Sequence, residues 1–382
     1  MSSIREIATF ISDGDWIESN DQSNYGIRLV QTGNIGNGEY LDKPDKAKYI
    51  SEETYSRLHC TDVYEGDILI SRLPDPIGRS CIVPQDIGRA ITAVDCTILR
   101  VNHNIYNPQF FVYYTQTDLY KSRLSHYLTG TTRKRISRKN LENIVVPQYP
   151  KKEQDIIVKK LDMITNLISL RKQQLENFDM LVKSRFLEMF GMSEGIDKHL
   201  EDVADICSGI TKGRKVLGLE LREVPYMAVS NVKMGYIDLS TVKTIMATES
   251  EIEQYRLFPN DILMTEGGDP DKVGRGAIIR NPPKDCIHQN HIFRVRLHKD
   301  VLLPEFFEEY LQGDSARRYF LKAAKQTTGI ASINMKQLRA LPVKIPPIKV
   351  QIQYSDFVHQ VDKSKYRGRI FLRLLEDVSH ML

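Results

Sequence analysis

Two stretches of the chain carry many basic side chains and no acidic one, and such stretches can bind phosphate. The first, residues 119–141, contains Lys121, Arg123, Arg133, Lys134, Arg135, Arg138 and Lys139. The second, residues 315–355, contains Arg317, Arg318, Lys322, Lys325, Lys336, Arg339, Lys344 and Lys349. A single basic run is usually a solvated surface. Two runs at matching places in two halves of a chain favour binding to the phosphates of a nucleic acid.

Polar side chains next to glycines could add contacts to base edges. Residues 26–38, GIRLVQTGNIGNG, form a glycine-rich segment that could approach a DNA groove closely. We predict contacts to bases for Arg28, Gln31, Thr32 and Asn34 in this segment, for Ser230, Asn231 and Lys233 in the second half, and for Arg72, Arg79 and Arg275 on turns beside strands. Arginine and glutamine can form paired hydrogen bonds with guanine and adenine.

A second group of residues is predicted to bind the DNA backbone, a contact that positions a protein without specifying a sequence. This group comprises Thr131, Thr132, Arg133, Lys134 and Arg135 in the first half and Thr327 and Thr328 in the second half. For every residue of both groups, an ordinary role in a turn or on the surface is an equally good interpretation.

No pattern in the sequence predicts catalysis. The segment Asn281–Lys284, NPPK, is similar to the NPPY motif of adenine methyltransferases, but Lys284 replaces the aromatic residue that stacks on a flipped base. No glycine-rich strand–turn–helix for a methyl donor precedes it, and the chain has no Walker A sequence. His288 and His291 fall on opposite faces of a predicted strand. We therefore expect no catalytic residue, no cofactor and no metal site.

The candidate residues belong to a chain with one very long predicted helix at its centre. Pro150 opens this helix and Gly191 closes it, which is the usual asymmetry of helix ends. A seam with alternating steps of four and three residues comprises Ile157, Leu161, Ile164, Ile168, Arg171, Leu175, Phe178, Val182, Arg185 and Met189. This heptad spacing predicts a helix that meets a partner along one stripe. Forty helical residues span about 60 Å, which is too long for the core of one small domain.

The end of the chain repeats this spacing. Its seam comprises Tyr354, Phe357, Val361, Ser364, Gly368, Phe371, Leu375, Val378 and Leu382. We predict that the two long helices pair as an antiparallel coiled coil. A long amphipathic helix that packs only on its own domain is the alternative.

The remaining sequence follows one plan twice, at an offset of about 197 residues. The strand pattern CTILRV at 96–101 corresponds to HIFRVR at 291–296. Helices with proline in the first turn follow at 107–120 and 303–320. A repeat of this length indicates a duplicated domain. We predict an α+β chain with one domain at 1–149, a long helix at 150–195, a second domain at 196–346 and a closing helix at 347–382.

The two copies differ most in their first thirds. Residues 10–30 and 206–223 share little, so they should carry the choice of target if both domains perform the same task.

The amino-acid composition agrees with a chain of two domains and two long helices. The 382 residues are enough for two or three domains. The five cysteines, Cys60, Cys81, Cys96, Cys207 and Cys286, are scattered without a CxxC motif and are expected to be free thiols. No apolar run approaches 18 residues and the first residues carry no signal peptide, so we expect a cytoplasmic protein without a membrane span.

At this point the sequence resembles the specificity subunit of type I restriction–modification enzymes. Each half ends in glycine, spaced aliphatic residues, proline and glutamine, and a long helix follows. The pattern comprises Gly130, Ile136, Leu141, Ile144, Val146, Pro150 and Gln154 in the first half and Gly329, Ile333, Leu338, Leu341, Val343, Pro347 and Gln351 in the second. The resemblance covers essentially the whole chain, although no single motif in it is as specific as a metal-binding motif.

This resemblance implies a fold, a function and partners. Two similar strand-rich α/β target recognition domains would be separated by two long helices, and each domain would read one half of a split, asymmetric site in double-stranded DNA. The helices would also dock two adenine methyltransferase (M) subunits and, through them, the restriction–translocation (R) subunits. A specificity subunit has no catalytic residues. Lys134 and Arg135 could instead contact the methyltransferase subunit.

The length of the helices suggests how the site is spaced. The seam of the first helix covers about 48 Å, whereas one turn of DNA covers about 34–36 Å. Two domains held at such ends would meet the same face of DNA and leave a gap between the half-sites.

Two other functions stay open at this stage. The first is a fused methyltransferase or nuclease that uses the same domains, which the missing donor-binding motif disfavours. The second is a scaffold or regulatory protein of a DNA-modification complex that does not read DNA itself, which the basic stretches disfavour weakly.

Overall fold

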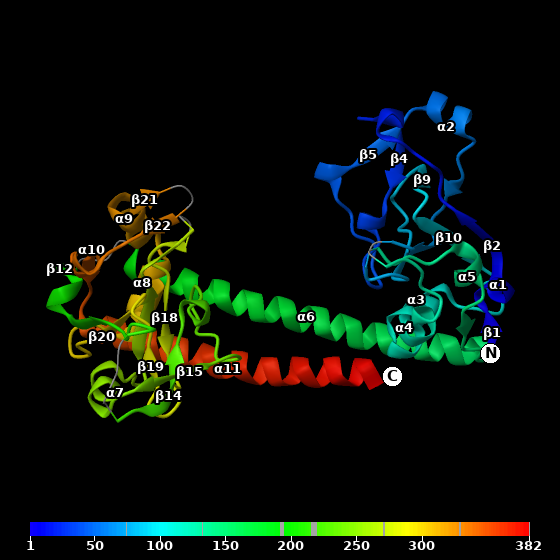
Figure 1. Ribbon diagram of the computed structural model, residues 1–382. Coiled ribbons are helices and arrows are strands. Elements are labelled where there is room, and N and C mark those ends of the chain that lie inside the picture. The colour runs from blue at the N-terminus through cyan, green and yellow to red at the C-terminus, as the bar shows by residue number, and fades with distance from the viewer. Residues whose placement is uncertain are drawn as a thin grey trace. The chain divides into compact units, whose positions relative to one another are not determined.

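The computed structural model describes residues 1–73, 75–131, 133–191, 195–214, 220–269, 272–327 and 330–381, with the backbone alone for residues 326, 327, 330 and 379–381. The chain divides into two compact units, Met1–Leu170 with Arg373–Leu382 and Arg171–Leu372. Each unit contains one strand-rich domain and parts of two long helices (Figure 1). The boundaries at 149, 195 and 346 that separate domains from helices stay predictions.

A four-stranded antiparallel sheet forms the centre of the first domain. In spatial order its strands are β2 (Ala8–Asp13), β10 (Cys96–Val101), β7 (Ile68–Ser71) and β8 (Ser80–Ile82). Because side chains alternate along a strand, β7 contributes to two cores. Ile68 and Ile70 pack with the helical layer, whereas Leu69 packs with residues of a second sheet.

Short helices cover one face of this sheet. They are α1 (Ile4–Ile7), α3 (Pro108–Gln116), α4 (Asp118–Ser125) and α5 (Arg138–Glu142). The local sequence explains where the last three begin, because the side chains of Asn107, Thr117 and Ser137 accept hydrogen bonds from backbone N–H groups of the first turn. The strand pair β1 (Ser2–Ser3) and β11 (Val145–Val146) closes the domain.

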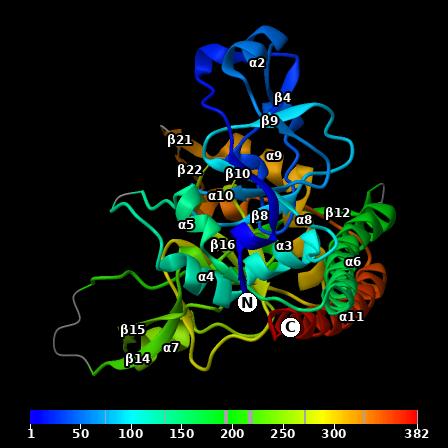
Figure 2. The same cartoon turned by 90° about the vertical axis from the view of Figure 1, so that its right-hand side faces the viewer.

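The second sheet lies at the end of the domain remote from the first long helix (Figure 1). Its order is β3 (Gln22–Ser23), β5 (Lys48–Ile50), β4 (Ile27–Val30), β9 (Ala90–Thr92) and β6 (Asp62–Val63). The helix α2 (Glu52–Leu58) and the 3-10 turns η1 (Ser19–Asp21), η2 (Thr32–Asn34) and η3 (Pro44–Lys46) connect these strands. Figure 2 shows α2, β4 and β9 together at this end. The divergent segment 10–30 contributes β3 and β4 to this sheet and the end of β2 to the central sheet.

The second domain repeats this topology. Its central sheet has the order β13 (Ala204–Ser208), β20 (Ile292–Leu297), β16 (Asp261–Thr265) and β18 (Gly276–Ile279). A second sheet has the order β15 (Lys243–Ala247), β14 (Arg222–Met227) and β19 (Ile287–His288). The covering helices and turns are η4 (Leu200–Asp202), η5 (Val229–Asn231), α7 (Glu249–Tyr255), α8 (Pro304–Gln312), α9 (Asp314–Ala323) and α10 (Met335–Arg339). The strand pair β12 (Ile196–His199) and β23 (Pro342–Ile345) closes this domain.

The predicted duplication is therefore confirmed. Both central sheets have the same strand order, and β4 and β14 each pair antiparallel with one neighbour and parallel with the other. The second domain adds a small sheet that the sequence did not indicate, with β17 (Gly267–Gly268), β22 (Ile330–Ser332) and β21 (Lys325–Thr327).

Two long helices follow the domains, as predicted. They are α6 (Lys151–Phe190) and α11 (Ile348–Met381). Within the second unit α11 lies antiparallel to the second half of α6 (Figures 1 and 2). The guanidinium of Arg185 lies 6.0 Å from the ring centre of Phe357, and that of Arg171 lies 5.0 Å from the ring centre of Phe371. The two basic interruptions of the seam are thus accommodated by cation–π contacts with the partner helix.

The side-chain exposure on α6 follows the predicted seam. Ile164, Ile168, Arg171, Leu175, Phe178, Val182, Arg185 and Met189 are half-buried. Leu161 is buried, and Ile157 packs against the core of the first domain. The least exposed stripe of α6 therefore has the heptad spacing that the sequence indicated.

On α11 the stripe differs from the prediction at alternate positions. Its less exposed residues are Tyr354, Val358, Val361, Lys365, Gly368, Leu372 and Leu375, whereas Phe357 is half-buried and Ser364, Phe371 and Val378 are exposed. The prediction counted apolar residues only, but Lys365 belongs to the stripe because its ammonium binds Asp179 of α6. Gly368 belongs to it because a Cβ there would lie 3.1 Å from Leu175. Leu382 lies outside the described residues.

Each domain is joined to the start of a helix by one buried glutamine. The Gln154 carboxamide of α6 accepts a hydrogen bond from the Asn107 N–H at 2.8 Å and donates to the carbonyls of Ile105 at 2.9 Å and Tyr149 at 2.8 Å. In the second domain Gln351 of α11 accepts from the Leu303 N–H at 2.9 Å. It donates to the carbonyls of Val301 at 3.0 Å and Pro346 at 2.8 Å. Both side chains are fully buried, so the glutamine of the sequence pattern is a clamp between domain and helix.

We predict that Gln154→Leu lowers the free energy of unfolding by about 2–4 kcal/mol, because one backbone N–H and two carbonyls lose their buried partner. Chemical denaturation of the full chain measures this difference. Gln173→Leu, at an exposed position of the same helix, is the control and should change stability by at most about 0.5 kcal/mol. Equal stability of both variants would show that the clamp is dispensable.

Candidate nucleic-acid interface

The 3-10 turns that follow β4 in the first domain and β14 in the second, η2 and η5, have the same internal brace. In η2 the Asn34 carboxamide accepts from the Gln31 N–H at 3.0 Å and donates to the Leu41 carbonyl at 2.9 Å. In η5 the Asn231 carboxamide accepts from the Ala228 N–H at 2.9 Å. Asn34 is 7% exposed and Asn231 is 4% exposed. Both asparagines were predicted to contact bases, but in the structure their polar atoms are used inside the turn.

The brace leaves other side chains of these turns at the surface. Gln31, Thr32 and Lys233 are half-buried, and Ser230 is exposed. In the second domain Met234 and Tyr236, which we did not predict, are 45% and 58% exposed. Their signal in the sequence is the glycine between them: Gly235 has a φ of +73°, which places a turn there and points its neighbours outward.

Two of the predicted arginines are largely inside the first domain. Arg28 of β4 pairs with Asp42 at 3.2 Å, and its side chain is 11% exposed. Arg72 is 4% exposed, donates to the Val94 carbonyl and lies 3.4 Å from the Asp13 carboxylate. Buried charges are paired in this way because an unpaired buried charge is costly. The sequence showed the cations but not the tertiary partners that hold them.

The equivalent arginines Arg79 and Arg275 differ between the domains. Arg79 donates to the carbonyls of Ile35 at 2.6 Å, Pro76 at 2.8 Å and Thr32 at 2.9 Å, so it holds η2 against the central sheet. Burial lowers the pKa of its guanidinium. Arg275 follows a turn of the same kind, but among the described residues its side chain has neither a hydrogen bond nor an ion pair.

The predicted phosphate-binding residues lie on an exposed loop of the first domain. Thr131, Arg133 and Lys134 are exposed, and Arg135 is exposed with its guanidinium 3.8 Å from Asp95. The backbones of Thr129 and Arg135 pair across this loop. In the second domain Thr327 ends β21, with only its backbone described. Thr132 and Thr328 lie outside the described residues.

Several exposed cations of the two basic stretches have no ion pair to any residue that the structure describes. They are Arg133, Lys134 and Lys139 in the first domain and Arg317, Lys322, Lys325, Lys336 and Arg339 in the second. Cations that are not neutralised within the protein can replace the counterions of DNA. Both domains therefore present charge that suits a polyanion.

The remaining motifs occupy ordinary structural positions. Asn281–Lys284 lies in the turn between β18 and β19. His288 is fully buried, and burial lowers its pKa to about 4, whereas His291 is exposed and binds Glu266 at 2.6 Å. Burial raises the pKa of Cys81 and Cys96 to about 12, so these thiols are protonated at neutral pH. No described helix combines the length and apolar character that crossing a membrane requires.

Comparison of the sequence with known proteins identifies a protein family that this chain matches. The sequence profile described as "Type I restriction modification DNA specificity domain" matches residues 1–177 and 194–367. The chain is 25% identical over 288 residues to the type I restriction enzyme EcoKI specificity subunit of Escherichia coli K12. That alignment covers 70% of this chain and 61% of the relative, so the chain spans about three fifths of that protein.

Two solved structures share the fold. The S subunit of a type I restriction–modification system from M. genitalium has a TM-score of 0.54 at 13% identity, with 99% of this chain and 93% of that chain covered. A chain from a structure that describes complex assembly and conformational transition of the type I R-M system has a TM-score of 0.58 at 16% identity, with 99% and 92% covered. At these identities the likeness shows the fold alone.

Proposed function

This chain belongs to the family of type I restriction modification DNA specificity domains, and we propose that it is the DNA-recognition subunit of a type I restriction–modification complex. Each domain reads one half of a bipartite, asymmetric site. The chain has no catalytic centre of its own, and methyltransferase subunits that bind it modify adenine. The observation that carries this proposal is the duplicated domain with a constant frame and different surface residues.

The constant part of the two domains is buried and polar. The bidentate ion pair between Arg100 and Asp67, at 2.7 and 3.0 Å, has its counterpart in Arg296 and Asp261, at 2.8 Å for both bonds. The asparagine brace and the glutamine clamp also occur in both domains. These contacts fix the backbone of each turn before DNA is bound, which limits the ordering that binding requires.

The variable part lies on the braced turn itself. Residues 31–33 of the first domain are Gln-Thr-Gly, whereas residues 228–230 of the second are Ala-Val-Ser. Side chains of different hydrogen-bonding character on one rigid frame suit two different half-sites, since base edges are distinguished by donors and acceptors. A scaffold without DNA recognition would have no use for this combination of a rigid turn and unpaired cations.

We predict that deleting this gene from a host that retains the partner methyltransferase gene removes one split N6-methyladenine motif from the genome. The motif should consist of two short half-sites with about 5–8 unread base pairs between them, within roughly one helical turn. Sequencing the methylome of the host with and without the gene measures this. If no motif disappears while the methyltransferase is expressed, the scaffold function replaces recognition.

A second part of the proposal concerns the partner subunits. On the first half of α6 the apolar residues Ile156, Met163, Leu167 and Leu170 are 55%, 55%, 46% and 62% exposed. Their spacing places them on one face of the helix, apart from the coiled-coil seam. Exposed apolar stripes mark protein–protein contacts in soluble proteins. We propose that a methyltransferase subunit docks on this stripe, that two such subunits bind the chain, and that restriction subunits join through them.

We expect the double substitution Leu167→Asp with Leu170→Asp to weaken binding of the methyltransferase subunit at least about tenfold, because charges would replace two exposed leucines that the proposed contact buries. Titration of the purified subunits measures the affinity. The control is Ser169→Asp, an exposed position on another face of the same helix. Undiminished affinity of the double variant, with an unchanged circular dichroism spectrum, would place the docking surface elsewhere.

A further inference from the structure

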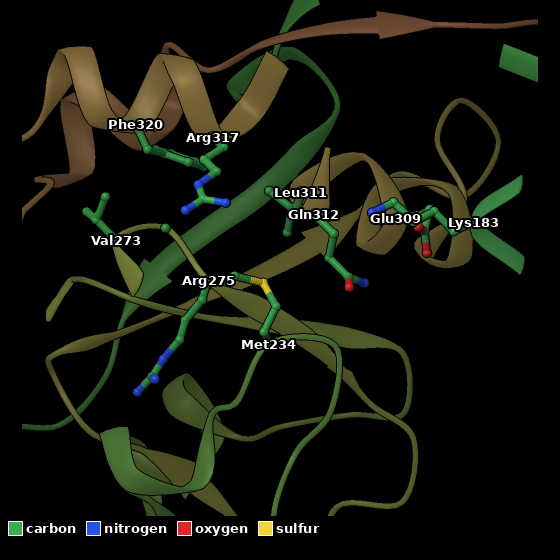
Figure 3. A pocket seen from close by; sticks show the side chains of 10 residues that line it. Lys183, Met234, Val273, Arg275, Glu309, Leu311, Gln312, Arg317 and Phe320 are labelled. Atoms are coloured by element: carbon green, nitrogen blue, oxygen red, sulfur yellow. The ribbon is translucent and has the colours of Figure 1, made fainter. Parts of the chain in front are cut away.

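Equivalent basic residues of the two domains have different contacts. Two basic residues of the second domain that differ in this way from their counterparts line one pocket. The pocket has a volume of about 180 Å³ and is lined by Arg275, Arg317, Gln312 and Met234, among others. All of its residues belong to the second unit. Figure 3 shows Arg317 reaching from α9 towards Met234, whereas the side chain of Arg275 extends away along the rim.

The backbones around Arg79 and Arg275 are alike. The glycines before them have φ values of +81° and +70°, and a Cβ on either would collide with a helix of the covering layer, at Leu124 of α4 or at Phe320 of α9. In both domains the carbonyl of the arginine accepts from the preceding strand, from the Ser71 N–H at 2.9 Å or the Thr265 N–H at 3.0 Å. The different side-chain positions therefore arise on one backbone frame.

Their side chains have different partners. Arg79 uses its guanidinium to hold the η2 turn, as described above. In the second domain Asn231 donates to the Thr241 carbonyl at 2.9 Å in addition to the Asp238 carbonyl at 2.8 Å, and no described contact of Arg275 holds the η5 turn. The Nε of Arg275 is buried without a hydrogen-bond partner among the described residues, and its side chain extends away from the pocket in Figure 3.

Arg317, the second cation of the pocket, also differs in its ion pairing from its counterpart in the first domain. Lys121 of α4 forms an ion pair with Asp118 at 3.1 Å. The equivalent residue of α9 is Arg317, which is exposed and forms no ion pair in the described part of the chain, although Asp314 stands at the corresponding position. Asp269 is bound by Lys272, and this hydrogen bond, with a smaller contribution from the charge of Arg275, lowers the pKa of its carboxyl group.

We propose that Arg275 and Arg317 bind two phosphates of one DNA strand, and that the first domain has no such grip at the equivalent positions. This inference rests on the proposed function and adds an asymmetry to it. Guanidinium groups bind phosphate oxygens well. Because the two side chains diverge, they suit an extended phosphodiester backbone better than a single phosphate ion. Two phosphate contacts in one domain increase the binding free energy at the half-site of that domain. This contribution depends on salt and not on the DNA sequence.

The test is the salt dependence of DNA binding by the full chain assembled with its methyltransferase subunits. Arg275→Gln and Arg317→Gln should each reduce the magnitude of the slope of log Kobs against log salt by about 0.9, and the double variant by about twice that. Arg275→Lys should retain the wild-type slope. The matched control is Lys299→Gln, an exposed cation of the same domain outside the pocket, which should leave the slope unchanged.

Thermal unfolding distinguishes an arginine that contacts DNA from an arginine that stabilises the fold. Arg79→Gln should lower the unfolding midpoint because it removes a brace, whereas Arg275→Gln should not. Wild-type slopes in both pocket variants would overturn the proposal. A midpoint that inorganic phosphate raises in the wild type but not in Arg275→Gln, together with unchanged slopes, would also overturn it in favour of a free anion site.

The same slopes, measured on DNA of unrelated sequence, keep this test independent of the proposed function. If the wild-type complex shows no preference for a split site, sequence recognition fails. The slope difference on unrelated DNA still decides whether Arg275 and Arg317 contact phosphates.

Discussion

The structure depends on how a domain is attached to a helix, and one buried carboxamide does this in each half of the chain. Gln154 and Gln351 each bind one N–H and two carbonyls. A carboxamide that satisfies three buried groups tolerates little rotation, since any movement leaves a donor or acceptor without a partner. Each domain is therefore continuous with the helix that begins beside it. A hinged attachment would let the domain rotate, which would not suit the proposed reading of bases in a fixed register.

Polar side chains also fix the backbone inside each domain. The side chains of Asn34 and Asn231 fix turns, and so do the ion pairs of Asp67 with Arg100 and Asp261 with Arg296. The buried contacts that hold these turns therefore do not depend on which residues face solvent. Because two copies within one chain keep this frame and differ at the surface, the surface residues to which we assign recognition can vary between domains at small cost in stability.

Much of the architecture could be predicted from the sequence because it depends on local patterns. The duplication, the two long helices and the seam of α6 follow from repeated spacing, N-caps and heptads. The direction of single polar side chains could not be predicted. Asn34, Arg72 and Arg79 were expected at the surface, but each finds backbone carbonyls supplied by segments distant in sequence or by its own turn.

The seam of α11 shows the same limit in another form. A search for apolar residues favoured Phe357 and Phe371, whereas the stripe includes Lys365 and Gly368. Lys365 fits because Asp179 of the facing helix binds its ammonium, and Gly368 fits because Leu175 approaches it closely. Both reasons reside in the partner helix, so the sequence of α11 alone could not contain them. Among the residues predicted to contact DNA, the sequence identified cations that are exposed, but it did not divide them between phosphates and bases.

We propose that the paired helices act as a ruler, so that their length fixes the gap between the two half-sites. The most direct measurement inserts one heptad after Glu176 in α6 and one after Arg367 in α11, near the facing residues Leu175 and Gly368, which keeps the seam in phase. Seven residues lengthen each helix by about 10.5 Å, or about three base pairs of DNA. Methylome sequencing should then show both half-sites unchanged and the gap longer by about three base pairs. An active complex that methylates the original motif with its original gap would contradict this account.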